Sequence, residues 1–309
     1  MNTIIIGDCV ANLRTLATLG FKAQMCVTSP PYFGLRDYGH PGQIGLEASP
    51  DEYVTRMVEV FRGVRDVLSD DGTLWLNIGD TYAGGGGGNY SKGTRNNSGQ
   101  NVTNVRNRPD WLASAGLKAK DLLGIPWMLA FALRADGWYL RQDIIWHKPN
   151  PMPESVRDRC TKAHEYMFLL SKSERYYFDS NAMKEQVTQA GKRILLGKKS
   201  FAKGQALGAG VAPSGNGLVD FYDVPEYRNR RSVWTIATKP YAGAHFAVFP
   251  PSLIEPCILA GSRPGDIVLD PFMGSGTTAM VAKQNSRQYL GCELNPAYEP
   301  LWRARLEAA

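Results

Sequence analysis

The segment from residue 266 to residue 293 constrains the fold more strongly than any other part of the chain. It begins with an apolar run, Asp266-Ile-Val-Leu-Asp270, followed by a glycine-containing turn, a helical segment at 277–285 and a second apolar run at 288–293. These features predict two strands joined by a helix, and such strands lie parallel because the helix crosses back over the sheet. Apolar runs and helical segments alternate through most of the chain, so we expect an α/β fold with a doubly wound, mostly parallel sheet.

Similar patterns place the other elements. A cap at Ser49 and a proline in the first turn predict a helix that Asp71-Gly72 ends. Further helices are expected at 9–19, 119–136, 251–259 and 296–306, and further strands at 4–6, 25–27, 72–80, 138–147, 165–170 and 176–178.

Composition limits the class of protein. A chain of 309 residues is long enough to bury one large α/β core, alone or with a smaller domain. Its net charge of +6 is compatible with a polyanionic partner. The five cysteines include no Cys-x-x-Cys pair and the four histidines lack metal-ligand spacing, so we expect reduced thiols and no metal. The chain starts with a strand-like run rather than a signal and has no long apolar stretch, so we expect a cytoplasmic protein without a membrane partner.

Two segments interrupt the alternation of helix and strand. Residues 83–109 contain five consecutive glycines and no acid, which favours either a disordered insertion or a mobile basic loop that closes over a phosphate backbone. Residues 180–232 form a basic insert between the first part of the core (1–179) and the last (233–309), and favour either a substrate-recognition region or a solvated surface. The cations expected to contact a polyanion are Lys92, Arg95, Arg106, Arg108, Lys192, Arg193, Lys198, Lys199, Arg228, Arg230 and Arg231.

A ligand site is expected where the strands end, because open α/β sheets bind ligands at the carboxyl ends of their strands. Gly274 and Gly276 let the backbone approach a ligand closely, and the helix that follows offers free amides to an anion. Glu293 ends the next strand, about 20 residues further on, where a carboxylate can bind both hydroxyls of a ribose. The arrangement predicts a nucleotide-type cofactor, with a dinucleotide enzyme as the alternative. Asp8 also follows a strand, either at this site or as the cap of a helix.

A second motif, Thr28-Ser-Pro-Pro-Tyr32, follows the apolar run at 25–27. Two consecutive prolines end a strand, because each lacks an amide donor and has a fixed φ. The Ser29 hydroxyl and the Pro30 carbonyl then lie beside the ring of Tyr32, and acceptors next to a stacking ring suit a flat group with an exocyclic NH₂. The alternative is an ordinary turn from a strand into a loop.

Taken together, Asp270-Pro-Phe-Met-Gly-Ser-Gly-Thr-Thr278 and Thr28-Ser-Pro-Pro-Tyr32 resemble the paired motifs of the DNA amino-methyltransferases of the permuted β class. In that class the Pro-Pro-Tyr motif precedes the glycine motif, as it does here, and the resemblance covers nearly the whole chain outside 83–109 and 180–232. It implies a circularly permuted, Rossmann-like methyltransferase fold that uses S-adenosyl-L-methionine, with 180–232 as the target-recognition region.

The resemblance also assigns roles to residues. Gly7-Asp8 matches the family's acidic turn, whose carboxylate contacts the adenine of the cofactor, and 245–252 is similar to the segment that packs over its methionine part. The segments 145–151 and 164–166 match wall strands of the family. The residues expected to bind the cofactor are Asp8, His245, Ser252, Asp270, Phe272, Gly274, Ser275, Gly276, Thr277, Thr278 and Glu293, and the catalytic residues are Ser29, Pro30, Pro31 and Tyr32.

The implied reaction is site-specific methylation of an exocyclic amino group on a base flipped out of double-stranded DNA. Ser29 and the Pro30 carbonyl would accept the two N–H groups, and Tyr32 would stack on the base. Serine at position 29 favours cytosine N4, with adenine N6 still open; an RNA methyltransferase and an inactive DNA-binding homologue are further alternatives. The family is also compatible with a homodimer, a cognate restriction endonuclease and a nucleoid-associated location.

One further motif, Pro256-Cys257, is similar to the nucleophile motif of cytosine carbon-5 methyltransferases. It lies within a predicted amphipathic helix rather than at the end of a strand. We therefore interpret Cys257 as a core thiol and expect direct methyl transfer without a covalent intermediate.

Overall fold

The computed structural model describes residues 1–83, 116–188, 193–196, 220–223, 225–238 and 249–309. It contains two compact units. The first combines Met1–Ala182 with Ser232–Ala309, and the second is Met183–Arg231. Both sequence motifs belong to the first unit, which therefore contains the candidate site.

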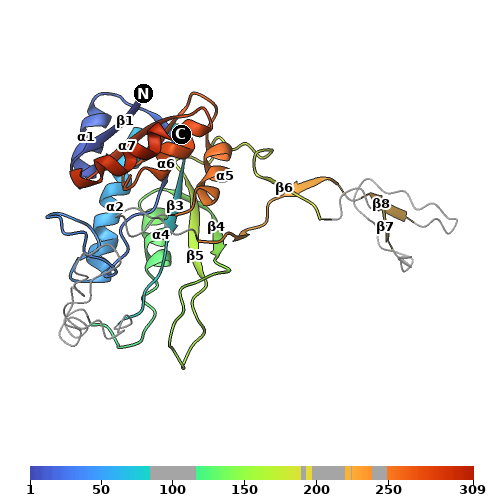
Figure 1. Cartoon of the computed structure of the whole chain (residues 1–309), viewed down its shortest axis with the longest axis horizontal. Helices are drawn as coiled ribbons and strands as arrows, with labels where there is room; N and C mark the ends of the chain where they lie inside the picture. The colour runs from blue at the N-terminus through green and yellow to red at the C-terminus, as the bar shows by residue number, and fades with distance from the viewer. Residues whose placement is uncertain (84–115, 189–192, 197–219, 224, 239–248) are drawn as a thin grey trace. The chain divides into compact units, whose positions relative to one another are not determined.

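The first unit is built on an eight-stranded sheet (Figure 1). Its strands, in spatial order, are β1 (Asn2–Ile6), β12 (Gln288–Glu293), β11 (Ile267–Asp270), β2 (Ala23–Thr28), β3 (Leu68–Ile78), β5 (His164–Ser171), β4 (Tyr139–His147) and β10 (Val233–Thr235). All neighbouring strands pair in parallel except where β5 pairs with β3 and β4. The predicted mostly parallel sheet is confirmed.

Helices cover both faces of this sheet (Figure 1). On one face α1 (Cys9–Thr18) packs on α2 (Pro50–Val67), which packs on α4 (Ile125–Ala135). On the other face α5 (Pro251–Gly261) packs on α6 (Thr277–Gln284), which packs on α7 (Glu299–Glu307). A short 3₁₀ helix, η1 (Pro296–Tyr298), precedes α7. The result is a three-layer, doubly wound α/β fold.

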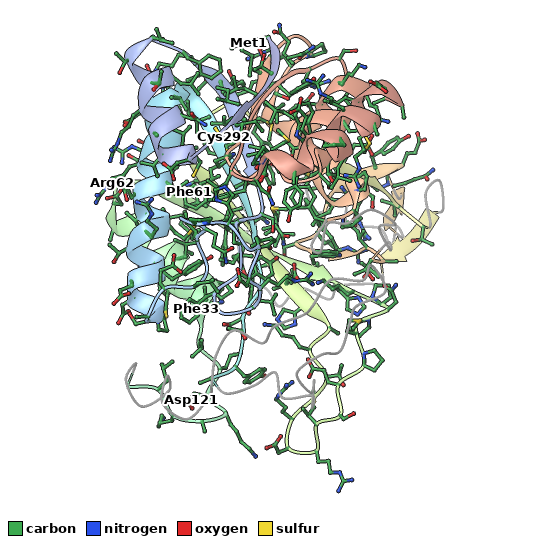
Figure 2. All side chains as sticks on the ribbon, turned by 60° about the vertical axis from the view of Figure 1, so that its left-hand side comes forward. Met1, Phe33, Phe61, Arg62, Asp121 and Cys292 are labelled. Atoms are coloured by element: carbon green, nitrogen blue, oxygen red, sulfur yellow. The ribbon has the colours of Figure 1, made fainter. Side chains whose placement is uncertain are left out.

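The sequence of α2 explains its position. The Ser49 hydroxyl accepts a hydrogen bond from the amide of Glu52 at 3.2 Å, and Pro50 occupies the first turn, so the helix starts where the sequence predicted. Phe61 is fully buried in the core, whereas the neighbouring Arg62 points outward (Figure 2). The Nε of Arg62 donates to Asp136 at 2.7 Å, which links α2 to the end of α4.

The order of the strands creates a switch point in the sheet. From β2 the chain passes through α2 to β3 on one side, whereas from β11 it passes through α6 to β12 on the other. The two paths diverge between β2 and β11, which are parallel neighbours. In open α/β sheets a crevice forms at the carboxyl ends of the strands at such a point.

Two expected boundaries and one expected strand were wrong. Helix α2 ends at Val67, and β3 begins at the next residue instead of at Gly72, because Leu68 is buried beside Ala23 of β2. The helix expected at 119–136 begins only at Ile125, since Gly124 has a left-handed φ of 76° that interrupts a helix. The strand expected at 176–178 is absent; Phe178 instead stacks on the ring of Trp75, with centroids 6.4 Å apart.

The second unit has two small antiparallel pairs. Strand β6 (Lys184–Gln186) pairs with β9 (Tyr227–Asn229), and β7 (Arg193–Leu196) pairs with β8 (Asp220–Asp223). Glu185 of β6 accepts hydrogen bonds from Arg228 at 2.8 Å and Arg231 at 2.9 Å.

In the described part of the whole chain, no helix combines the length and apolar character needed to cross a membrane.

The packing of α1 on α2 gives a stability prediction. Leu13 is fully buried at this contact, so Leu13→Ala is expected to lower the free energy of unfolding by about 2–5 kcal/mol through lost burial and a residual cavity. The matched control is Leu19→Ala, which truncates a leucine that is 76% exposed and should change stability by less than about 0.5 kcal/mol. Chemical denaturation measures both, and equal losses would contradict the packing.

Candidate active site

A cavity of about 670 Å³ lies at the edge of the sheet where the parallel strands end. Each strand around the switch point contributes a polar side chain at or just after its last residue, and β5 contributes one near its first. The antiparallel direction of β5 places its start at the same edge as the ends of its neighbours. These side chains are Asp8 after β1, Glu293 of β12, Asp270 of β11, Ser29 after β2, Asp80 after β3, Lys148 after β4 and Glu165 of β5.

Glu293 is the acid at the end of β12, and its side chain is held by the turn after β11. One carboxylate oxygen accepts from the amide of Gly274 at 2.8 Å and the other accepts from the amide of Asn295 at 2.8 Å. Burial raises the pKa of this carboxyl group. Glu293 thus presents a fixed, largely desolvated acceptor at the cavity wall, a geometry suited to a pair of ligand hydroxyl groups.

Asp270, which the sequence predicted to bind the cofactor, is engaged by neighbouring groups of the protein. Its carboxylate accepts from the Thr28 hydroxyl at 2.6 Å, the Thr278 hydroxyl at 2.6 Å and the amide of Phe272 at 3.0 Å. The group is buried, and burial raises its pKa to about 6. Asp270 lines the cavity, but its hydrogen bonds join β11 to β2 and to the start of α6. Its visible function is to hold the switch point together.

The remaining predicted cofactor residues are placed as follows. Asp8 caps α1 by accepting from the amide of Ala11 at 2.9 Å, and it also lines the cavity, so the two interpretations of this residue are compatible. Gly276 caps α6 with a left-handed φ of 82°, and a Cβ there would lie 2.6 Å from the Cβ of Trp302. Ser252 is exposed on α5 and is not among the lining residues. Phe272, Gly274, Ser275 and Thr277 line the cavity, whereas Thr278 is fully buried beneath it.

The Pro-Pro-Tyr corner forms the opposite side of the cavity. Ser29, Pro30, Pro31 and Tyr32 all line it, so the structure brings the four predicted catalytic residues together with Glu293. The hydroxyl of Tyr53, fully buried in α2, donates to the Pro31 carbonyl at 2.9 Å and fixes the corner against the helix. Ser29 Oγ lies 3.5 Å from the hydroxyl of Tyr32.

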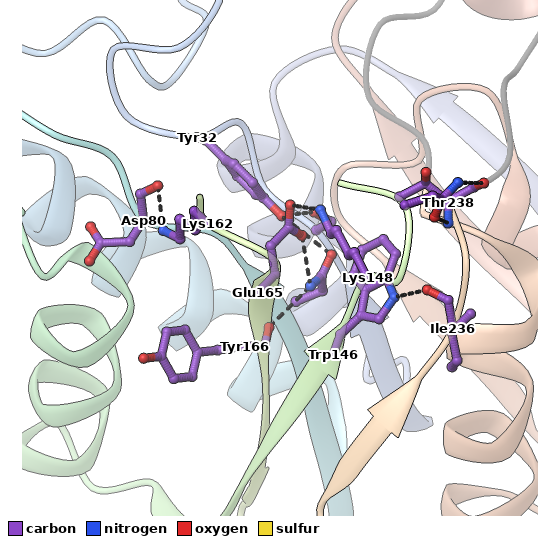
Figure 3. Close-up of polar contacts among 12 residues, drawn as sticks. Tyr32, Asp80, Trp146, Lys148, Lys162, Glu165, Tyr166, Ile236 and Thr238 are labelled. Carbon is purple, nitrogen blue, oxygen red and sulfur yellow. Dashed lines mark hydrogen bonds and ion pairs between the residues drawn. The ribbon is translucent and has the colours of Figure 1, made fainter. Parts of the chain in front are cut away.

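Several residues at this corner received no individual role from the sequence. The Tyr32 hydroxyl donates to Glu165 at 2.8 Å, and Lys148 forms an ion pair with the same carboxylate (Figure 3). Asn77 of β3 lies next to them, with its side-chain oxygen 3.3 Å from the Tyr32 hydroxyl. Lys148 and Glu165 fall in the segments matched to the family's wall strands. The signal that could have singled them out is a charged side chain at the end of an otherwise apolar strand.

Gly79, directly after β3, leaves room for the tyrosine ring. A Cβ at this position would lie 2.7 Å from Cε2 of Tyr32 and 3.3 Å from Cγ of Glu165. Contacts as short as the first do not occur in proteins without displacement of a neighbour. The absence of a side chain at position 79 is therefore a condition for the observed position of Tyr32.

The predicted DNA contacts are only partly described. Of Arg193 only the backbone in β7 is described. The predicted residues that lie outside the described ones are Lys92, Arg95, Arg106, Arg108, Lys192, Lys198 and Lys199, together with His245, which was predicted to bind the cofactor. Arg228, Arg230 and Arg231 lie in the second unit.

Cys257 is fully buried in α5, with Sγ 3.5 Å from the Leu253 carbonyl, so its interpretation as a core thiol is confirmed. Within the described residues, no group of three His, Cys, Asp or Glu side chains is arranged to hold a metal ion.

The raised pKa of Asp270 predicts a pH-dependent stability. Its pKa of about 6 in the folded protein exceeds the ordinary value of 3.8, so its contribution to stability is complete at low pH and is lost as the pH rises through 6. Between about pH 4 and pH 7 the wild type should lose roughly 2–2.5 kcal/mol of unfolding free energy relative to Asp270→Asn, which does not titrate. Chemical denaturation of both proteins across this range measures the difference. A difference that does not change with pH would contradict the assignment.

Comparison with known proteins agrees with this geometry. The family model described as DNA methylase, which covers N6 and N4 methyltransferases, matches residues 23–303. Type II methyltransferase M.Cfr9I of Citrobacter freundii is 47% identical over 305 residues, which are 99% of this chain and 87% of that protein. Type II methyltransferase M.SmaI of Serratia marcescens is 46% identical over 303 residues, which are 98% of this chain and 90% of that protein.

Solved structures show the same fold at lower identity. The PvuII DNA methyltransferase, described as cytosine-N4-specific, matches with a TM-score of 0.62 and 19% identity over 98% of this chain and 86% of that one. A putative DNA modification methylase of Thermus thermophilus, solved in complex with S-adenosyl-L-methionine, matches with a TM-score of 0.58 and 20% identity over 100% of this chain and 94% of that one. With the family model matching most of its length and close relatives spanning nearly all of it, this chain belongs to the DNA methylase family of N4 and N6 amino-methyltransferases.

Proposed function

We propose that the protein uses S-adenosyl-L-methionine to methylate an exocyclic amino group of a base flipped out of duplex DNA, with cytosine N4 as the target. One observation carries the proposal: Ser29 and Glu293 line a single cavity from the two sides of the switch point. The first side offers hydrogen-bond acceptors and an aromatic ring, and the second offers a fixed carboxylate beside a glycine turn. These two sides suit an amino-bearing base and a nucleoside cofactor, respectively.

The described residues fit the cofactor. Glu293 would bind the ribose hydroxyls, because its carboxylate is already oriented by Gly274 and Asn295. The backbone between Gly274 and Thr277 lines the cavity and leads into α6, where free amides suit a carboxylate. Asp8, at the end of β1, would contact the adenine. The bound cofactor supplies an electrophilic methyl group on a sulfonium centre.

The corner at 29–32 would prepare the nucleophile. An exocyclic NH₂ is a poor nucleophile because its lone pair is conjugated into the ring. If Ser29 Oγ and the Pro30 carbonyl accept its two hydrogens, the nitrogen becomes more pyramidal and its lone pair turns toward the methyl group. Tyr32 would hold the ring by stacking, so that positioning provides most of the rate enhancement. No metal and no covalent enzyme intermediate is required.

The choice of cytosine N4 rests on Ser29, with adenine N6 as the second outcome. The relatives named above are type II methyltransferases, which supports DNA as the substrate. The structural neighbour described as cytosine-N4-specific shares the fold of this chain. The proposal extends to DNA contacts from the basic residues of 83–109 and 180–232, including Arg228 and Arg230. A homodimer, a cognate endonuclease and a nucleoid-associated location stay predictions.

The test is methyl transfer from labelled S-adenosylmethionine to unmethylated genomic DNA, followed by mass spectrometry of the nucleosides. N4-methylcytosine is the expected product, whereas N6-methyladenine would overturn the choice of base. Label on RNA but not on DNA would overturn the substrate class. Cofactor binding in calorimetry without transfer to either nucleic acid would indicate an inactive homologue.

Two variants separate the two sides of the cavity. Ser29→Ala should lower the rate of methyl transfer roughly 100-fold with little change in cofactor Kd, because it removes an acceptor used in the transition state. Glu293→Ala should raise the cofactor Kd about 10- to 100-fold, because it removes charge-assisted hydrogen bonds. Single-turnover kinetics and calorimetry measure the two effects.

Cys257→Ala is the matched control for this pair. This change removes the buried thiol of Cys257, which lies outside the cavity, so the variant should transfer methyl groups at the wild-type rate. Equal losses of rate and cofactor affinity in Ser29→Ala would contradict its assigned role. An unchanged cofactor Kd in Glu293→Ala would remove Glu293 from the cofactor site.

A further inference from the structure

The ring of Tyr32 is held from outside its own motif. Its hydroxyl donates to Glu165 Oε2 at 2.8 Å, and Oε1 of the same carboxylate pairs with Lys148. The side chains of Lys148 and Glu165 are each 17% exposed, so the pair is largely removed from solvent. Burial raises the pKa of the Tyr32 phenol, which therefore stays protonated and acts as the donor to Glu165.

Lys148 is itself fixed by contacts that lead toward β10 at the edge of the sheet. Its ammonium group lies 4.3 Å from the centre of the Trp146 ring, a cation–π contact. The indole Nε1 of Trp146 donates to the Ile236 carbonyl at 2.8 Å, which anchors the tryptophan after β10 (Figure 3). A continuous series of contacts therefore runs from the edge of the sheet to the phenol of Tyr32.

The direction of β5 explains how a carboxylate reaches this point. Glu165 is the second residue of β5 and pairs with Trp146 of β4, while Tyr166 pairs with Ile78, the last residue of β3. A strand parallel to β3 and β4 would have its carboxyl end, rather than its first residues, at this edge of the sheet. Gly79, next along the chain after β3, provides the space that the ring and the carboxylate fill. Since a largely buried ion pair contributes little net stability, its presence is better explained by orientation of a neighbour than by stability.

We infer that Glu165, held by Lys148, is a positioning residue for methyl transfer: it fixes the Tyr32 ring in the orientation that receives the target base. This inference rests on the proposed function, in which Tyr32 stacks on that base. In this role Glu165 acts through the tyrosine hydroxyl rather than directly on the base or the cofactor. Its loss should therefore lower the rate of transfer and leave cofactor binding intact.

The experiment is a double-mutant cycle of Tyr32→Phe and Glu165→Ala, with single-turnover methyl transfer to unmethylated genomic DNA and cofactor Kd as readouts. Each single variant should reduce the transfer rate about 10- to 100-fold, because the ring loses its fixed orientation. The double variant should be no slower than the slower single variant, since both changes break the same contact. Losses that multiply in the double variant would overturn the inference, because Glu165 would then act independently of Tyr32.

A conservative variant separates positioning from a structural effect. Glu165→Gln keeps an oxygen that accepts from Tyr32 but loses the ion pair, so it should recover most of the rate that Glu165→Ala loses. A Gln variant as slow as the Ala variant would count against a role through the hydroxyl. Asp70→Asn is the matched control: it removes the charge from an ion pair with Lys172, 3.1 Å apart, at the opposite end of β3, and should leave the rate unchanged.

Failure of this inference differs from failure of the proposed function. If the wild-type protein transfers no methyl group to DNA, the proposed function fails and the cycle has no reference rate. If the wild type is active and Glu165→Ala is equally fast while thermal unfolding shows it to be folded, only the positioning role fails. A raised cofactor Kd in Glu165→Ala would likewise overturn that role.

Discussion

The hydrogen bond between Thr28 and Asp270 is the contact on which the site depends. It joins β2 to β11 at the switch point, over a distance of 2.6 Å and a separation of 242 residues in the chain. One side of this contact continues into the Pro-Pro-Tyr corner, and the other continues into the glycine turn that orients Glu293. The buried carboxylate of Asp270 accepts from two hydroxyls and one amide, and these hydrogen bonds hold the two motifs next to each other. In the proposed function, the cofactor side and the base side then share one cavity, as methyl transfer requires.

The second organising feature is β5, which runs antiparallel to its neighbours in the eight-stranded sheet. In a wholly parallel sheet, every strand presents its carboxyl end to the ligand, and side chains reach the site from the loops that follow. Strand β5 instead presents its start, so Glu165 stands on a hydrogen-bonded strand between β3 and β4. A residue on a strand is held more rigidly than one on a loop. This rigidity suits a side chain whose proposed role is to fix another.

Much of the fold could be predicted because the apolar periodicity is strong. The parallel sheet, the strand at 288–293 and the start of α2 follow from burial and capping, which are local properties. The start of β3 could not be predicted, because Leu68 fits the apolar stripe of α2 and only its pairing with β2 places it in a strand. The aromatic residues at 176–178 are typical of a strand, yet Phe178 packs through its ring on Trp75. Long-range contacts decided both positions.

For the site, the sequence motifs located the cavity but did not predict all the hydrogen bonds between its side chains. Ser29, Tyr32 and Glu293 line it as expected, since strand ends and glycine turns can be recognised locally. The engagement of Asp270 by Thr28, and of Tyr32 by Glu165, could not be read from the sequence because each joins residues more than a hundred positions apart. Ser252 was assigned by resemblance alone, and its exposure on α5 places it outside the cavity wall.

The position of β11 beside β2 has a consequence for synthesis of the protein. Strand β2 is made early, but its neighbour β11 and the next strand, β12, emerge from the ribosome only after more than 230 further residues. Until then one edge of β2 has unpaired backbone groups, and an unpaired edge favours association with other chains. The centre of the sheet therefore closes last, and with it the cavity. A nascent chain that stops before residue 267 carries the Pro-Pro-Tyr corner without the Glu293 side of the site.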